Sequence, residues 1–364
     1  MKVPFTSLGK RYSYYKKNIM NNFHKISSKG DFILDKNVEI FEKKISRICQ
    51  SKYVVSVNSG FDALFLSLKC LGITKGDEVI TVSNSYIATA SSIVAVGAKP
   101  VFVDVGEDYN INSDLIEKKI NPRTKAIMPV HLTGNPCDMA KICNLAKKYK
   151  LKIIEDSAQA IGASFGNKKV GTFGEFGCFS LHPVKNFHVF GDGGIILTQK
   201  KEYYKILKLL RNHGHKNRDE ISLWGYNSRL DSIQAGIALA MIKDFSKWNK
   251  KINSIANFYK KNIVSPVIHQ KIHKKAKSVF HNYIIQVPKR DKLKVFLLKN
   301  GIDTRIHYPI PIHKQAMFKL GKNKFNLDNT EKQSKNIISL PIYPEIKIEQ
   351  AKYISKKINE FYKS

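Results

Sequence analysis

Short runs of β-branched and other apolar residues alternate, between residues 50 and 200, with longer segments whose apolar residues recur every three or four positions. The short runs are typical of buried strands, and the longer segments are typical of helices with one apolar face. The predicted strands are residues 78–82, 99–105, 125–131, 152–156, 178–182 and 194–198. The predicted helices are residues 60–72, capped by Asn58 or Ser59, and residues 138–150, capped by Asp138. Strands and helices in this order predict an α/β fold in which helices cover a mostly parallel sheet.

The pattern changes after residues 230–245, which are predicted to form one long buried helix. A lysine-rich helical segment follows, and then a strand at 281–287, a helix at 290–301 and a final amphipathic helix near 347–362. A region with few strands and no regular alternation is typical of an α+β unit. We therefore predict a large α/β domain at 1–245 and a smaller C-terminal α+β domain at 246–364.

The composition is that of a globular protein, with 364 residues of which 43% are hydrophobic. The first residues lack the apolar core of a signal peptide, and no segment approaches the ~18 apolar residues of a membrane span. The cysteines lie mostly in apolar runs and form no close Cys/His pairs of the kind that bind zinc. They are Cys49, Cys70, Cys137, Cys143 and Cys178. We expect reduced core thiols, no metal site, no membrane partner and a cytoplasmic location.

The charge balance is strongly basic, with 62 Lys and Arg against 29 Asp and Glu, or +33. Such a balance can indicate nucleic acid, a membrane surface or acidic ligands. The lysines recur along the whole chain, however, and form no single stripe with interleaved aromatic residues. We interpret them as a solvated surface and expect no nucleic-acid partner, although a dedicated polyanion site stays an alternative and a small acidic substrate fits both interpretations.

Polar residues follow several predicted strands, at the edge of the sheet where ligands of open α/β folds bind. They are Tyr86 after the first strand, Asp156 and Gln159 at and just beyond the end of the fourth, and Ser180, His182 and Lys185 at and just beyond the end of the fifth. The turn at residues 57–61 leads into a helix, whose free N–H groups and positive dipole end would suit a phosphate. An acid, an amine able to form an imine, an aromatic ring and a phosphate cradle together predict a pyridoxal phosphate site.

At these positions the sequence resembles the DegT/DnrJ/EryC1/StrS family of sugar aminotransferases. The resemblance extends over nearly the whole chain and includes VNSGFDALFLSL, IIEDSAQAIGASF, FSLHPVKNFHVFGDGG, GYNSRLDSIQAGIA and GIDTRIHYPIPIH. It implies the aspartate aminotransferase fold (type I), with a large, mostly parallel seven-stranded sheet domain, and pyridoxal 5'-phosphate as cofactor.

The resemblance also implies a role for each matching residue. Lys185 forms the Schiff base with the cofactor and moves protons, while Asp156 pairs with the pyridinium nitrogen. The other cofactor contacts that it implies are Gln159 near the 3-hydroxyl, Tyr86 stacked on the ring, Gly60, Phe61 and Ser180 at the phosphate, and Asn227 reaching the phosphate of a neighbouring subunit. The active site would therefore require a homodimer.

The chain departs from the family pattern at two positions, and it carries four histidines in the quoted segments. Many relatives read Ser-Gly-Thr before the phosphate-binding helix, whereas this chain has Phe61 in place of the threonine, so one hydroxyl is missing. Asp35 stands where a glycine is usual, and we expect a local turn adjustment. The histidines could contact substrate, steady Lys185 or fill space, and their spacing does not decide among these roles. They are His182, His188, His307 and His313.

The resemblance implies a ping-pong aminotransferase that takes an amino group from glutamate and gives it to a nucleotide-linked keto sugar for amino-sugar and surface glycan biosynthesis. Gly-Asp-Gly-Gly at 191–194 favours a 3-keto-6-deoxy sugar, because relatives acting at C-4 often have Glu at the position of Asp192. A C-4 or C-2 enzyme is the alternative within the family. The related sugar dehydratases have histidine in place of Lys185, which argues against that activity. A nucleic-acid-binding regulatory protein that retains the fold is the alternative from another class.

Overall fold

The structure is a computed structural model that describes residues 1–264, 266–319 and 325–363. Its centre is a seven-stranded sheet with the strand order β1-β9-β8-β5-β4-β2-β3. The strands are β1 (Tyr53–Val57), β2 (Glu78–Val82), β3 (Lys99–Val103), β4 (Thr124–Ile127), β5 (Lys152–Asp156), β8 (Phe176–Ser180) and β9 (Gly194–Thr198). Only β9 pairs antiparallel with its two neighbours, whereas the other pairings in this sheet are parallel. The predicted α/β fold with a mostly parallel seven-stranded sheet is confirmed.

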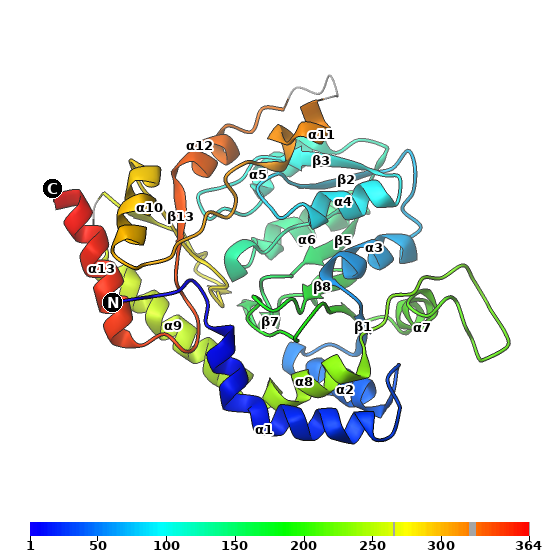
Figure 1. Cartoon of the computed structure of the whole chain (residues 1–364). Coiled ribbons are helices and arrows are strands. Elements are labelled where there is room, and N and C mark those ends of the chain that lie inside the picture. The colour runs from blue at the N-terminus through cyan, green and yellow to red at the C-terminus, as the bar shows by residue number, and fades with distance from the viewer. Residues whose placement is uncertain (265, 320–324, 364) are drawn as a thin grey trace.

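Helices cover both faces of this sheet (Figure 1). One face carries α3 (Gly60–Cys70), α4 (Ala88–Ala95) and α7 (Lys201–Leu210), and the other carries α5 (Ser113–Ile116), η1 (Glu117–Lys119) and α6 (Met139–Lys148). Side chains of a strand alternate between faces, so Val79 packs with α3 while Ile80, the next residue, packs with α6. Both faces are therefore apolar, which explains the continuous apolar runs of these strands.

A third group of helices lies beside the β1 and β9 end of the sheet. It consists of α1 (Leu8–Ser27), α2 (Lys36–Cys49) and α8 (Ser232–Met241). The helix predicted over 230–245 is interrupted, because α8 is followed by the 3-10 turn η3 (Ile242–Asp244) and then by α9 (Phe245–Asn262). Within that turn, the Asp244 carboxylate accepts a hydrogen bond of 2.7 Å from the Tyr15 hydroxyl. This tertiary contact with α1 accompanies the break in the helix. No Gly or Pro lies at residues 241–245 from which the break could have been predicted.

The C-terminal part contains a smaller sheet with the order β10-β12-β13. Its elements are β10 (Ile268–His269), β12 (Tyr283–Gln286), β13 (Ile337–Leu340), α10 (Arg290–Lys299), α12 (Asp328–Asn336) and α13 (Ile348–Lys363). The remaining short elements are η2 (Leu132–Gly134), β6 (Ser164–Phe165), β7 (Lys168–Lys169), β11 (Ala276–Lys277), η4 (Ile312–Lys314) and α11 (Ala316–Lys319). Val3 joins the core of this part and bridges Ile302, so the chain's first residues contribute to it. The domain boundary near 245 stays a prediction, and positions 265, 320–324 and 364 of the predicted second domain lie outside the described residues.

All five cysteines are free thiols. Cys49, Cys137 and Cys178 are buried, and burial raises the pKa of Cys49 to about 12. Among the described residues, no helix combines the length and the apolar character that crossing a membrane requires. The same part of the chain contains no group of three His, Cys, Asp or Glu residues that could hold a metal ion.

Candidate active site

Lys185 lies in the loop that follows β8, at the edge of the sheet where the parallel strands end. The loop returns on itself, because the Val189 amide donates to the Leu181 carbonyl at 2.9 Å. The Lys185 amide donates to the His182 carbonyl at 2.9 Å, which closes a tight turn that ends at the lysine. Burial lowers the pKa of the Lys185 amine to about 8, and the negative charge of Asp156 opposes that shift. Lys185 is therefore an amine with an unusually large neutral fraction near pH 8.

Asp156 is the last residue of β5, and only 5% of its surface is exposed. Its Oδ2 accepts a hydrogen bond of 2.7 Å from the Thr89 hydroxyl, and its Oδ1 accepts one of 3.2 Å from the Ala158 amide. Burial raises the pKa of this carboxyl, while the bonds from Thr89 and Ala158 and the charge of Lys185 lower it. The acid and the amine thus affect each other electrostatically across the sheet edge.

Gln159 is held one turn beyond Asp156. Its Oε1 accepts a hydrogen bond of 2.7 Å from the Thr133 amide, which leaves Nε2 pointing to the Tyr308 hydroxyl at 3.5 Å. The ring of Tyr308 in turn lies 6.1 Å from the ring of Tyr86, centroid to centroid. Tyr86 is 59% exposed, so it is not a core residue. Its ring is accessible on the same side of the sheet as Gln159.

The residues predicted to cradle a phosphate lie where α3 begins beside the end of β8. The Ser59 hydroxyl caps α3 by accepting from the Asp62 amide at 3.0 Å. The amides of Gly60 and Phe61 have no hydrogen-bond acceptor within the described part of the chain. A Cβ placed on Gly60 would lie 2.7 Å from Ser180 Cβ, so only glycine lets α3 approach the strand this closely. Two free N–H groups and the Ser180 hydroxyl therefore meet at a helix N-terminus, which is suited to a phosphate.

The two departures from the family pattern have local structural explanations. Phe61 turns its ring onto that of Phe65, with 6.1 Å between the centroids, and supplies no hydroxyl to the cradle. Asp35 is the N-cap of α2, where its Oδ1 accepts from the amides of Asn37 and Val38 at 3.0 and 3.3 Å. Leu34, the residue before it, takes the left-handed conformation with φ of 52°. The left-handed residue of this turn is therefore Leu34, one residue before Asp35.

The four predicted histidines do not form one group. His307 lies near Lys185, because burial and then the charge of Lys185 lower the pKa of His307 to about 4. His182 is exposed, and the charges of His307 and His182 contribute to a lowered pKa of the nearby His281. His188 is buried, and its Nδ1 lies 3.3 Å from Nη1 of Arg11. His313 is occupied elsewhere, because its Nδ1 lies 2.6 Å from the Ser83 hydroxyl and its Nε2 lies 3.2 Å from Oε1 of Glu331. No sequence spacing separates these environments.

Several residues of the site escaped the sequence prediction. A cavity of about 220 Å³ beside Lys185 is lined by Arg11, Asn186, His281, Asn282 and Arg305, among others. Burial lowers the pKa of His281, and the charge of Lys185 contributes to that shift. His281 begins the segment predicted as a strand at 281–287, so its polar character at a strand start was the available signal. Arg305 lies in the segment GIDTRIHYPIPIH, whose resemblance to the family was the available signal. Arg11 had none, because its position at this cavity depends on packing between distant parts of the chain.

Asn227 is exposed and lies outside this cavity. It bridges Asn212 at the base of a loop that projects from the body of the protein after α7 (Figure 1). The neighbouring Ser228 hydroxyl donates to Oδ2 of Asp62 at 2.8 Å, which ties the base of the loop to α3. The side chain of Asn227 is therefore free to contact another molecule.

The geometry can be compared with known proteins. The sequence profile of the DegT/DnrJ/EryC1/StrS aminotransferase family matches residues 13–359. The chain belongs to this family. Membership in the DegT/DnrJ/EryC1/StrS family confirms the predicted aminotransferase class and the predicted pyridoxal phosphate cofactor. The roles of the single residues toward that cofactor stay predictions.

Three relatives illustrate the range of this family. A pleiotropic regulatory protein from Geobacillus stearothermophilus is 38% identical over 369 residues, which cover 100% of this chain and 99% of the relative. A dTDP-3-amino-3,6-dideoxy-alpha-D-galactopyranose transaminase from Aneurinibacillus thermoaerophilus is 38% identical over 361 residues, which cover 99% of each chain. The X-ray structure of S. venezuelae DesV in complex with a ketimine intermediate has a TM-score of 0.96 and 34% identity, and covers 99% of this chain and 98% of its own.

The residues present fit the cofactor of this family on structural grounds. The amine of Lys185 has a lowered pKa, a buried carboxylate faces the same region, and the cradle at Gly60 is one that a Cβ would fill. Phosphate, aldehyde and ring nitrogen are the three groups of pyridoxal phosphate that need partners. Each has a candidate partner among the described residues at this sheet edge.

Proposed function

We propose that this protein moves the amino group of glutamate to a nucleotide-linked keto sugar, with a 3-keto-6-deoxy sugar favoured, for amino-sugar and surface glycan biosynthesis. The observation that supports this most is the position of Lys185 after β8, near the buried Asp156, where burial lowers the pKa of the Lys185 amine to about 8. With this pKa roughly a quarter of the amine is neutral at pH 7.5, compared with about a thousandth for an ordinary lysine. Only the neutral amine can attack a carbonyl or accept a proton.

Pyridoxal phosphate, when bound, supplies an aldehyde that carries the amino group and a ring that accepts electrons. Lys185 would hold the aldehyde end, and its Nζ would take a proton from the substrate carbon and return it. Asp156 would keep the ring nitrogen protonated, because a buried carboxylate stabilises a nearby positive charge. The amides of Gly60 and Phe61 and the Ser180 hydroxyl would hold the phosphate.

Tyr86 and Gln159 would hold the ring of the cofactor. An exposed aromatic ring at Tyr86 can stack on a second ring and exclude water from it. The Gln159 amide is fixed by Thr133, so its Nε2 can donate a hydrogen bond to a hydroxyl without a loss of side-chain freedom on binding. These two residues would orient the cofactor without taking part in proton transfer.

The preference for a 3-keto sugar rests on the turn at residues 191–194. A Cβ on Gly194 would lie 2.1 Å from the Ser59 carbonyl oxygen, so this turn is packed against the start of α3. Asp192, in the same turn, is exposed and can contact a bound molecule. The name of the Aneurinibacillus relative, a transaminase of a 3-amino sugar, supports amination at C-3. Amination at C-4 or C-2 is the alternative.

A homodimer with shared active sites would explain the exposed loop after α7. Hydrogen bonds between the Lys216 amide and the Glu220 carbonyl and between the Ser222 amide and the Gly214 carbonyl, both of 2.9 Å, form it into a hairpin. Trp224 is 96% exposed on this hairpin, which is unfavourable for a large aromatic residue in water. A second copy that covers Trp224 would also bring Asn227 to the neighbouring cofactor phosphate.

The test of this function is an amination assay with glutamate and a panel of nucleotide-linked 2-, 3- and 4-keto sugars. We expect turnover of the 3-keto substrate by the wild-type protein, and none by Lys185→Ala at equal cofactor concentration. Lys251→Ala, an exposed lysine away from the site, is the matched control and should keep wild-type activity. Turnover of the 4-keto sugar alone would contradict the preference for C-3 but support the family activity. No turnover of any sugar would contradict the proposed function.

A regulatory, nucleic-acid-binding role is the second candidate, supported by the net charge of +33 and by the name of the Geobacillus relative. The two functions differ in a simple measurement. The enzyme should be yellow when loaded with pyridoxal phosphate and lose its visible band when glutamate is added. A colourless protein that cannot be loaded, yet binds duplex DNA in a salt-dependent way, would favour the regulatory role.

Five free thiols are compatible with action in the cytoplasm.

A further inference from the structure

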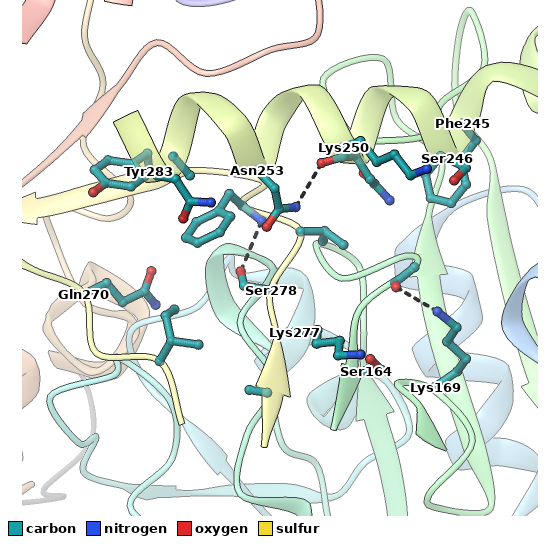
Figure 2. A pocket seen from close by; sticks show the side chains of 18 of the residues that line it. Ser164, Lys169, Phe245, Ser246, Lys250, Asn253, Gln270, Lys277, Ser278 and Tyr283 are labelled. Carbon is teal, nitrogen blue, oxygen red and sulfur yellow. Dashed lines mark hydrogen bonds between the residues drawn. The ribbon is translucent and has the colours of Figure 1, made fainter. Parts of the chain in front are cut away.

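A second and larger cavity, of about 970 Å³, lies between α9 and the chain segment 269–284 (Figure 2). It is distinct from the cavity beside Lys185. Residues 278–280 line the large cavity, whereas His281 and Asn282 line the smaller one, so this stretch of chain stands between the two. The two cavities have no lining residue in common.

One face of α9 supplies a polar side to this cavity. Side chains three or four positions apart along a helix share a face. Six such residues line the cavity, namely Ser246, Asn249, Lys250, Asn253, Asn257 and Lys260. In Figure 2 the side chains of Ser246, Lys250 and Asn253 extend from α9 on the side that faces Ser278. Hydroxyl and amide groups are thus interleaved with lysines along one wall.

The cavity is lined by five lysines and by no carboxylate among the described residues. The lysines are Lys169, Lys243, Lys250, Lys260 and Lys277. None of the five forms an ion pair within the part of the chain that the structure describes. Lys169 donates to the Gly162 carbonyl at 3.2 Å, which leaves its charge uncompensated. The potentials of these charges add inside a concave surface, which attracts anions more strongly than the same lysines would on a flat one.

The remaining lining suits an aromatic ring beside the anion. Phe245, Phe280 and Tyr283 belong to it. The Tyr283 hydroxyl lies 2.9 Å from Nδ1 of His269, so its polar end is already satisfied. Flat apolar side chains beside amides and cations are the groups that contact the base, the ribose and the phosphates of a nucleotide. The volume also lies within the range of cavities that hold small organic ligands.

We propose that this basic cavity is a binding site for a nucleoside diphosphate, separate from the site at Lys185. The phosphates contact the lysines, the ribose contacts the amides and hydroxyls of α9, and the base packs on the aromatic residues. The wall of the cavity opposite α9 is hydrogen-bonded to Asn186, the residue after Lys185. The Asn186 side chain donates to the Val279 carbonyl at 2.9 Å, and its Oδ1 lies 3.1 Å from Nδ1 of His281.

The experiment is a calorimetric titration of the protein saturated with pyridoxal phosphate, so that its phosphate cradle is occupied. The probes are uridine diphosphate, inorganic pyrophosphate and uridine. The site variant carries Lys250→Glu and Lys277→Glu. Its matched control carries Lys251→Glu and Lys274→Glu, which give the same change in net charge from exposed neighbouring positions outside the cavity.

We expect the wild-type protein and the control to bind uridine diphosphate at one more site per chain than the site variant does. Reversal of two charges near an anion predicts at least about a tenfold loss of affinity at that site. Pyrophosphate should compete for it, and uridine alone should bind weakly. Raising the salt concentration should weaken the binding of both anions.

Two results would overturn the proposal. One is equal binding of uridine diphosphate by the site variant and the control, with both variants folded by circular dichroism. The other is lysine-dependent binding of long single-stranded RNA while uridine diphosphate and pyrophosphate do not bind. That second result would assign the cavity to a nucleic acid instead.

Discussion

Gly60→Ala tests the phosphate cradle with a single added methyl group. Its Cβ would lie 2.7 Å from Ser180 Cβ and 3.2 Å from Ser180 Cα, and ordinary contacts begin at 3.4 Å. The start of α3 and the end of β8 must therefore separate by about 0.7 Å, the difference between 3.4 and 2.7 Å. Such overpacking costs ~1–3 kcal/mol of folding free energy. The same shift moves the amides of Gly60 and Phe61 away from the Ser180 hydroxyl.

A hydrogen bond to a charged group contributes ~1.5–3 kcal/mol, so the weakening of one phosphate contact should raise the Kd for pyridoxal phosphate roughly tenfold to a hundredfold. The assay is a titration of cofactor-free protein followed by visible absorption. Gly9→Ala is the control, because Gly9 lies in α1 with nothing within 4 Å of its Cβ position, and its Kd should not change. Ser180→Ala removes the hydroxyl without overpacking and should weaken binding about tenfold. A Kd for Gly60→Ala and Ser180→Ala within twofold of wild type would refute the cradle.

Four further outcomes are expected. Lys185→Ala should bind pyridoxal phosphate without the absorption band of the covalent lysine adduct, and retention of the wild-type spectrum would exclude Lys185 as the covalent partner. The reactivity of the Lys185 amine in cofactor-free protein should rise with pH with a midpoint near 8, because its pKa is lowered to about 8 and the neutral form predominates above it; a midpoint above 10 would contradict the effect of burial. Asp156→Asn should move that midpoint below 8, since the charge of Asp156 raises the pKa of Lys185. The same substitution should reduce amination by roughly a hundredfold or more while the fold stays intact. An upward shift of the midpoint would show that the two groups do not interact as inferred. Trp224→Asp should produce monomers in size-exclusion chromatography with light scattering. Leu298→Asp is the control and should not, because it changes a residue that is 61% exposed on α10. An unchanged dimer in Trp224→Asp would place the interface elsewhere.

The central sheet was predictable because its strands carry strong local signals. Strands β2, β5 and β9 begin and end at the predicted residues, since each is an apolar run bounded by polar or turn residues. Strand β1 was overlooked although Tyr53–Val57 is also β-rich. Its only partner in the sheet, β9, lies about 140 residues away in the sequence, since Tyr53 pairs with Thr198. A short edge strand with a distant partner has little to distinguish it from a loop until the pairing is known.

The candidate site was predictable to the extent that its residues follow strands. Asp156 and Ser180 end β5 and β8, and the topology of a parallel sheet brings such ends together. His281 was missed because its nearness to Lys185 depends on the path of a segment about 100 residues later in the sequence. Tyr308 was missed for the same reason, although it contacts both Gln159 and Tyr86. Residues that join a site through irregular segments leave no periodic signal.

The environment of His188 shows how the loop bearing Lys185 is held in place. Arg11 is buried, and its Nε and Nη2 bind the two carboxylate oxygens of Glu345 at 2.8 and 2.9 Å. Its Nη1 lies 3.3 Å from Nδ1 of His188, and its guanidinium lies 4.5 Å from the ring centre of Trp248. Burial, and then the positive charge of Arg11, lower the pKa of His188 to about 3. The imidazole is therefore neutral at physiological pH and can accept a hydrogen bond from Arg11, which a protonated ring would repel.

His188 is thus held by Arg11 of α1, and the charge of Arg11 is neutralised by Glu345 from the C-terminal part of the chain. Because His188 is 1% exposed, direct contact with a sugar would require the loop to move. Any influence of His188 on which carbon receives the amine must then pass through the position of the loop. Asp192 lies four residues further along and is exposed, so a bound molecule could contact it without a movement of the loop. The choice of carbon should accordingly respond more to substitution of Asp192 than to substitution of His188, whose replacement should instead disturb cofactor binding and stability.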